Sequence, residues 1–158
     1  MPDVEPQPWI LSSSPHVHEG STVRGLMRDV LIALLPAVVA AALRHGVDTF
    51  RLIFVCVAVS VLAEAATRFL MRRSLAVHDL SAAVTGLLLA LNLPPLLPSW
   101  MAALGALVAI VIAKQLFGGL GYNIFNPALA GRVFLLISFP VAMTTWAPPD
   151  AVTTATPL

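Results

Sequence analysis

The stretch LIFVCVAVSVLAEAATRF, residues 52–69, decides the fold class of this chain. Its first twelve side chains carry no charge, and the first charged residue is Glu64. A helix that crosses the hydrocarbon core of a bilayer needs about 20 mostly apolar residues, with a range of about 17 to 25. The length and composition of the stretch therefore predict a transmembrane helix.

The composition of all 158 residues also indicates a membrane protein. Apolar residues make up 58% and charged residues 11% of the chain, against about 45–50% and about 25% in soluble domains. With a mean hydropathy of +0.89, the chain has too few polar side chains to cover a globule in water, which excludes a soluble enzyme domain. A net charge of +1 gives no reason to expect a nucleic-acid partner. The single cysteine, Cys56, excludes an intrachain disulfide and a multi-cysteine metal site.

Four further apolar runs accompany the first one, and they are residues 26–43, 80–93, 101–116 and 127–146. The run 127–146 is comfortably long enough to span the membrane, and the run 26–43 is long enough but contains Pro36. The runs 80–93 and 101–116 are short for a span. We predict an all-α polytopic membrane protein with about five transmembrane helices, some of them short or broken. The expected organisation is a polar arm at 1–23, a transmembrane region at 24–146 and a final segment at 147–158. Because an odd number of passes is the size of one half of an inverted-repeat fold, we expect the chain to be one half of a longer polypeptide.

Basic residues fall unevenly on the two sides of this arrangement. With the N-terminus inside the cell, the inner set holds seven residues and the outer set only Arg44 and Arg51. The inner set is Arg24, Arg28, Arg68, Arg72, Arg73, Lys114 and Arg132. Because cytoplasmic loops retain Lys and Arg, we predict a cytoplasmic N-terminal arm. Five passes then place residues 147–158 on the outer face.

Two groups of helix-breaking residues interrupt the apolar runs. The pair Pro94-Pro95 ends the third run, and Asp79 is placed to cap its start with a carboxylate. The segment FGGLGYNIFNP, residues 117–127, holds three glycines, two asparagines and a proline. Since broken helices build polar sites in membrane proteins, Asn123 and Asn126 are candidates to line a polar cavity. The alternative is a cytoplasmic loop in which these residues only turn the chain.

Glu64 is the acid that lies well inside an apolar run, and it stands four residues before Arg68 on the same helical face. One interpretation is an ion pair near the inner interface, with the Arg68 guanidinium reaching water. The other is a carboxylate on an ion path, because intramembrane acids are costly and usually functional. His16 and His18 form too small a ligand set to predict a metal site. The sequence predicts no catalytic residue.

The last residues of the chain, DAVTTAT at 150–156, fit the pattern D-x-x-[ST]-x-A-T. A flavin transferase uses FAD to attach FMN through a phosphoester to the last threonine of this pattern, which is Thr156. Pro157 disfavours helix at Thr156 and so helps to keep its hydroxyl exposed. Asp150 is then the acidic residue of the transferase motif, and Thr153 or Thr154 would be the attachment point if Thr156 is not. The alternative is a polar outer loop that is rich in threonine.

Other segments, taken in order with this motif, resemble the D subunits of Rnf electron-transport complexes. These segments are residues 14–18, 79–91, 94–95, 117–128 and 138–146. The B subunits of sodium-translocating NADH:quinone reductases share much of this framework. The resemblance covers residues 12–158.

The resemblance implies a subunit of roughly twice this length in a bacterial inner membrane. It implies FMN bound covalently on the outer side and a second, non-covalent flavin, such as riboflavin, within the membrane. Asn123 and Asn126 are then candidates to contact a flavin ring or a coupling ion. The partners it implies are the other Rnf subunits, the flavin transferase and membrane lipid. The function it implies is electron transfer between ferredoxin and NAD, coupled to Na⁺ or H⁺ movement. A sodium-translocating NADH:quinone reductase subunit, a channel for a small polar solute and a scaffold without cofactor are the alternatives.

Overall fold

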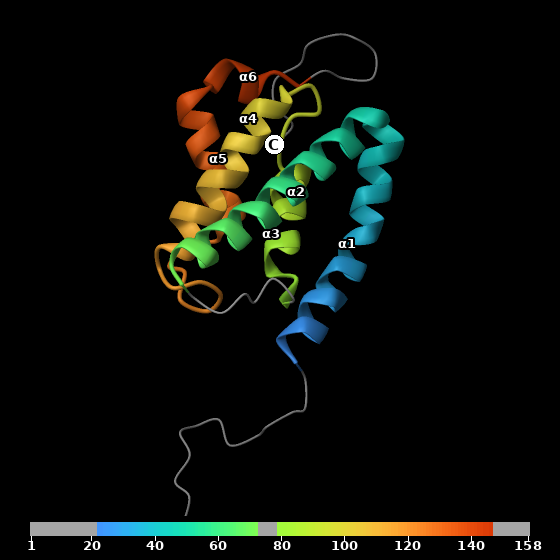
Figure 1. Ribbon diagram of the computed structural model, residues 1–158. Helices are drawn as coiled ribbons and strands as arrows, with labels where there is room; N and C mark the ends of the chain where they lie inside the picture. Colours follow the sequence, from blue (N-terminus) through green and yellow to red (C-terminus); the bar gives the residue numbers. More distant parts are fainter. Residues whose placement is uncertain (1–21, 73–78, 147–158) are drawn as a thin grey trace, which may run out of the picture.

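The computed structural model describes residues 22–72 and 79–146, and within these ranges the chain forms helices and connecting segments but no strand (Figure 1). In chain order the elements are α1 (Val23–His45), α2 (Val47–Leu70), α3 (Ser81–Leu91), α4 (Ser99–Leu107), the π-helix η2 (Val108–Gln115), α5 (Pro127–Ser138) and α6 (Pro140–Thr144). Their apolar composition confirms the predicted all-α membrane fold. The second half of an inverted repeat stays a prediction.

Two of these helices, α1 and α2, are long and apolar enough to cross a membrane. α1 has 23 residues, and it begins where the Thr22 hydroxyl accepts a hydrogen bond from the backbone N–H of Gly25. It continues through Pro36, which the predicted run already contained. α2 has 24 residues and includes the whole stretch from which the fold class was predicted.

The third and fourth runs are short in the structure as well. α3 has 11 residues, and the Asp79 carboxylate accepts hydrogen bonds from the N–H and hydroxyl of Ser81 at its start. The carboxylate at this helix terminus is therefore confirmed, although Asp79 lies one residue further out than a cap. α4 and η2 form one continuous rod over residues 99–115, and its second half is a π-helix.

The prediction of one long span at 127–146 is wrong. α5 ends at Ser138, and Phe139 has φ −135° and ψ 59°, which is not a helical conformation. Pro140 then starts the short helix α6. A residue before proline is disfavoured in the α region, so this apolar run breaks where its composition alone predicts continuity.

The predicted break between η2 and α5 is confirmed by the backbone. Gly118, Gly119 and Gly121 have φ values of 114°, 98° and 89°. Residues with a Cβ atom rarely adopt these backbone conformations, so the three glycines let the chain reverse within a few residues.

The core lies where α2 packs against α3 and α4 and where α5 packs against α3 and α4, and it is made mainly of small and aliphatic side chains. α2 and α3 approach so closely at Gly86 that an added Cβ would lie 2.7 Å from the backbone oxygen of Cys56. At Gly105 of α4, an added Cβ would instead meet the side chain of Leu135 at 2.5 Å. On the other side of the α4–α5 contact, an added Cβ at Gly131 would lie 2.7 Å from the backbone oxygen of Gly105. Both helix contacts therefore depend on glycine, but of Gly86 and Gly105 only Gly86 faces the backbone of a neighbouring helix.

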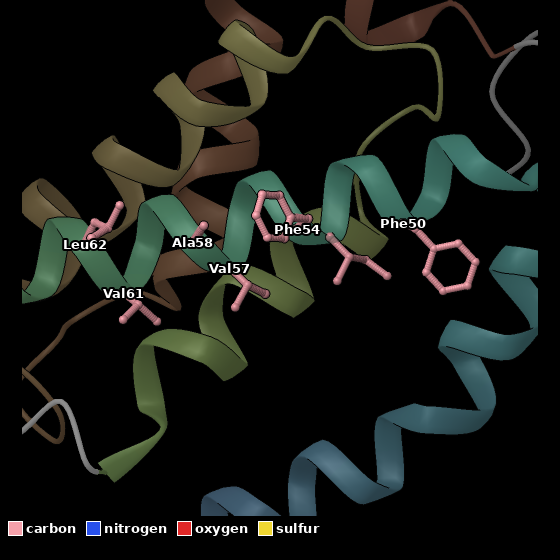
Figure 2. A pocket seen from close by; sticks show the side chains of 7 residues that line it. Phe50, Phe54, Val57, Ala58, Val61 and Leu62 are labelled. Carbon is pink, nitrogen blue, oxygen red and sulfur yellow. The ribbon is translucent and has the colours of Figure 1, made fainter.

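The opposite face of α2 is apolar and exposed, as Figure 2 shows. Phe50, Phe54 and Leu62 are 57%, 74% and 67% exposed, and they border an open groove of about 760 Å³. Large apolar surfaces on a soluble monomer are costly in water. This face is suited to hydrocarbon or to another protein surface within the membrane.

The ends of the helices alternate, which agrees with the predicted passes. In Figure 1 the start of α1 and the loop between η2 and α5 lie toward the lower end, whereas the α1–α2 turn and α6 lie toward the upper end. Lys114 and Arg132 lie within helices and bind residues of other helices, so they say little about loop charge. The same holds for Arg68 of the inner set and Arg51 of the outer set, which lie within α2 and bind Asp79 and the α3–α4 connection. Four basic residues of the inner set then remain against one of the outer set. Orientation therefore stays a prediction with a smaller margin.

We predict that Gly86→Ala destabilises the protein more than Gly105→Ala does. The first change forces apart two backbones and should cost about 1–3 kcal/mol, as overpacking does in other cores. The second meets only the rotatable side chain of Leu135. Thermal unfolding of the two variants in the same detergent measures the difference. Equal losses of thermal stability in the two variants would show that the backbone of α2 does not restrict position 86 more than the Leu135 side chain restricts position 105.

We predict that a cysteine at Ser99 reacts with an impermeant thiol reagent added to intact cells, whereas one at Ser74 does not. Ser99 starts α4 next to the predicted outer loop, and residue 74 belongs to the predicted inner loop. The background is Cys56→Ala, since Cys56 is the one native cysteine. The reverse labelling pattern would invert the orientation.

Candidate functional site

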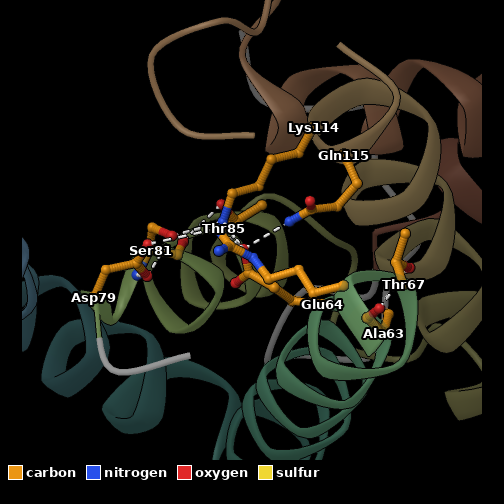
Figure 3. A network of polar contacts seen from close by, with 9 residues as sticks. Ala63, Glu64, Thr67, Asp79, Ser81, Thr85, Lys114 and Gln115 are labelled. Carbon is orange, nitrogen blue, oxygen red and sulfur yellow. Dashed lines mark hydrogen bonds and ion pairs between the residues drawn. The ribbon is translucent and has the colours of Figure 1, made fainter. Parts of the chain in front are cut away.

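Polar side chains from three elements meet inside the helix bundle (Figure 3). They are Glu64 and Arg68 of α2, Asp79 and Ser81 at the start of α3, and Lys114 and Gln115 of η2. The side chains of Glu64 and Lys114 are 0% and 2% exposed. We call these six residues the charge cluster.

One carboxylate oxygen of Glu64 is the centre of the charge cluster. Glu64 Oε1 lies 2.9 Å from Lys114 Nζ, and it accepts a hydrogen bond of 2.7 Å from Gln115 Nε2. An Arg68 guanidinium nitrogen lies 3.4 Å from the same oxygen. Charge-assisted contacts of this kind are stronger than neutral ones, so Glu64 ties η2 to α2.

Lys114 also reaches the start of α3. Its ammonium donates a hydrogen bond of 2.6 Å to Ser81 Oγ, and that hydroxyl donates one of 2.7 Å to Asp79 Oδ1. Arg68 lies 3.9 Å from the second oxygen of Asp79. The Lys114 ammonium therefore stands between two acids, one bound directly and one through a hydroxyl.

Two consecutive residues of η2, Lys114 and Gln115, enter the same cluster, and each is 1% exposed. The backbone of η2 is π-helical there, since the hydrogen bond from the N–H of Leu116 to the C=O of Val111 is 3.1 Å long and spans five residues. π-Helical turns occur often at functional sites.

The charge cluster is formally neutral, with Glu64 and Asp79 opposed by Arg68 and Lys114. Ions taken out of water cost several kcal/mol each unless partners replace the lost solvent. Removing one member would leave another charge uncompensated, which is strongly destabilising in buried pairs. The four charges therefore hold α2, α3 and η2 together as a set.

The sequence predicted part of this cluster. The ion pair of Glu64 with Arg68 is confirmed, but the expectation that Arg68 reaches water is wrong, because its side chain is 12% exposed and lies against two acids. The contribution of Lys114 and Gln115 was missed. A signal was present, since Lys114 is the one lysine of the chain and lies at the end of an apolar run. Use of Glu64 on an ion path stays a prediction.

Asn123 and Asn126 have local structural roles. Asn126 Oδ1 accepts a hydrogen bond of 3.0 Å from the N–H of Ala128 and so caps α5, ahead of Pro127. Asn123 Nδ2 donates to the C=O of Phe125 over 2.9 Å. Asn126 also borders an open apolar groove of about 540 Å³ along α5, which includes Phe125 and Phe134. Contact with a flavin or an ion stays a prediction for both asparagines.

Arginine side chains cover the proline-rich connection between α3 and α4. Arg51 donates to the carbonyl oxygens of Pro95 and Leu97, over 3.1 and 3.3 Å. Arg132 donates to Asn92 Oδ1 over 3.0 Å. The free carbonyls that a Pro-Pro break leaves in a membrane protein are therefore partly satisfied by side chains.

The predicted flavin-attachment residues, Asp150 and Thr156, lie outside the described residues, as do His16 and His18. Within residues 22–72 and 79–146, no three His, Cys, Asp or Glu side chains gather as a metal ligand set.

A helical membrane bundle built around a buried cluster of balanced charges defines the class of this protein as a polytopic membrane protein with a polar interior. Comparison with known proteins is more specific. Residues 10–158 match the model of the NQR2, RnfD, RnfE family, and the chain belongs to this family.

Two relatives illustrate the similarity. The D subunit of the Na⁺-translocating ferredoxin:NAD⁺ oxidoreductase complex of Acetobacterium woodii is 48% identical over 151 residues, which are 94% of this chain and 48% of that protein. The D subunit of the ion-translocating oxidoreductase complex of Salmonella paratyphi B is 48% identical over 149 residues, which are 93% of this chain and 42% of that protein. The chain thus spans about half the length of the curated relatives it matches.

Proposed function

We propose that the chain belongs to the D subunit of an Rnf-type complex in a bacterial inner membrane, where electron transfer between ferredoxin and NAD is coupled to Na⁺ or H⁺ movement. The observation that carries the proposal is the 48% identity to a D subunit over 94% of the chain. The buried charge cluster supports it, because ionisable groups inside a membrane bundle often mark an ion path. Glu64 is the residue we assign to that path.

The activity belongs to the assembled complex, so the partners are the other Rnf subunits, a flavin transferase and membrane lipid. Deletion of the gene should abolish NAD reduction by reduced ferredoxin in isolated membranes. Loss of NADH-dependent quinone reduction instead would support a subunit of a sodium-translocating NADH:quinone reductase, whose NQR2 proteins share the family. A channel for a small polar solute would change neither activity.

We further propose that FMN is bound covalently through a phosphoester to Thr156. The DAVTTAT motif at 150–156 supports this assignment, because it matches the acceptor pattern of the flavin transferase. The flavin supplies the redox chemistry. The chain supplies a hydroxyl for attachment, and Asp150 serves recognition by the transferase.

Protein made together with the transferase should show an FMN adduct on Thr156 by mass spectrometry of its proteolytic fragments. The band of the denatured protein should fluoresce under ultraviolet light, because a covalent flavin survives denaturation. Thr156→Val should abolish the adduct, and the neighbouring Thr154→Val is the matched control that should keep it. Asp150→Ala should lower modification without lowering thermal stability. An unmodified Thr156 in the unmutated protein contradicts the proposal.

A second, non-covalent flavin is proposed to lie against the segment 117–127, near the groove that runs along α5 from Asn126. Phe125 and Phe134 border this groove, and an aromatic side chain can pack against the apolar part of an isoalloxazine. An amide offers both a donor and an acceptor to the polar edge of the ring. The cap uses the Asn126 oxygen and leaves its amide N–H groups for this role.

We predict that Asn126→Asp lowers the content of non-covalent flavin while thermal stability stays near that of the unmutated protein. Aspartate keeps an oxygen to cap α5 but has no amide donor. Asn126→Ala is the comparison, since loss of a cap costs about 1 kcal/mol. Flavin released by denaturation and quantified by absorbance is the measurement. If Asn126→Asp and Asn123→Leu both keep the full content of non-covalent flavin, the segment 117–127 only turns the chain and does not bind the flavin.

A further inference from the structure

Two buried oxygen atoms beside the charge cluster have no hydrogen-bond partner among the described residues. They are Oε2 of Glu64 and Oγ of Ser60, and both residues are 0% exposed. Ser60 and Glu64 are four residues apart in α2, so their side chains lie one turn apart on the same buried face. Buried oxygens without partners are rare in native proteins and call for an explanation.

Of the two cations beside Glu64, Lys114 is held in a way that permits it to leave, while Arg68 follows Glu64 on the same helix. The Lys114 ammonium contacts Glu64 Oε1 and, at the same time, Ser81 Oγ, which is bound to Asp79. If Lys114 withdraws from Glu64, its charge keeps the Ser81 hydroxyl and the nearby Asp79 carboxylate. An ammonium on a flexible four-carbon side chain is suited to such an exchange, more than a planar guanidinium is.

We propose that Lys114 is a tethered counter-ion of Glu64 that Na⁺ displaces, and that the Glu64 carboxylate and the Ser60 hydroxyl then bind the ion. This inference rests on the proposed function, in which the complex moves a cation. Carboxylate and hydroxyl oxygens are suitable ligands for a hard cation. A bound ion would also give both unpartnered oxygens a partner.

Charge balance makes the displacement reversible. The cluster is neutral with Lys114 in place, so an added Na⁺ leaves one excess positive charge in a medium of low dielectric constant. This excess charge penalises the occupied state, so a negative charge that appears nearby would favour binding of the ion and its loss would favour release. A site that moves an ion must bind it weakly enough to release it.

Carbodiimide labelling of Glu64 tests the site without any measurement of activity. Dicyclohexylcarbodiimide modifies protonated carboxyl groups in apolar surroundings, and a bound cation protects them. In membranes that contain the assembled complex, Na⁺ should slow the labelling of Glu64 relative to choline at the same ionic strength.

Two variants separate an ion site from a purely structural pair. In Lys114→Met the competing ammonium is gone, so half-maximal protection should need about tenfold less Na⁺, as expected when a competitor occupies the site most of the time. Ser60→Ala, a small change that keeps every charge, should need about threefold more Na⁺, as expected for loss of one neutral ligand. Labelling that is the same in Na⁺ and choline, or a Ser60→Ala variant identical to the unmutated protein, overturns the proposal.

Uptake of radioactive Na⁺ into inverted membrane vesicles completes the test. The double variant Glu64→Gln with Lys114→Met removes one charge of each sign, and Arg68 and Asp79 still balance one another. The ratio of Na⁺ uptake to electrons transferred should be about tenfold lower in this variant than in the unmutated complex. Full uptake in this variant would show that the pair is only structural. Absence of any cation uptake in the unmutated complex would instead refute the proposed function, and the labelling of Glu64 would still report the site.

Discussion

Burial of Glu64 away from water is the constraint on which the rest of the bundle depends. A lone carboxylate in this position would cost several kcal/mol, so the fold must bring cations to it. Lys114 comes from η2 and Arg68 from the next turn of α2. The same ammonium reaches Ser81, which fixes the start of α3. One acid thereby positions three elements that are far apart in sequence.

The breaks in the helices follow from a second constraint, because backbone groups in a membrane need partners when a helix stops. After α3 the partners are arginine side chains, with Arg51 bound to two carbonyls of the proline-rich connection. Before α5 they are local, with Asn126 capping the helix. Short helices are thus compatible with this fold because the residues around each break replace the missing backbone partners.

Composition and helix-breaking residues made much of the fold predictable from the sequence. The sequence did not predict which side chains pair with one another across helices. The apolar run 52–69 gave α2, and Pro94-Pro95 gave the end of α3. Hydropathy failed at Pro140, because a count of apolar residues does not register that Phe139 is kept out of the helical conformation. The pairing of Glu64 with Gln115 joins residues 51 positions apart, and Gln115 is the last residue of a π-helix. No local pattern encodes such a contact.

The two faces of α2 show why the charge cluster and the membrane depend on each other. α2 buries Glu64 and Ser60 but exposes Phe50 and Phe54, the reverse of a helix in a water-soluble protein. In hydrocarbon the exposed phenylalanine side chains carry no free-energy penalty. The polar groups lower their free energy by binding one another inside the bundle. A low dielectric constant also strengthens the attraction between Glu64 and Lys114, while it raises the penalty for an added ion. Such a cluster is therefore sensitive to any single change of charge next to it.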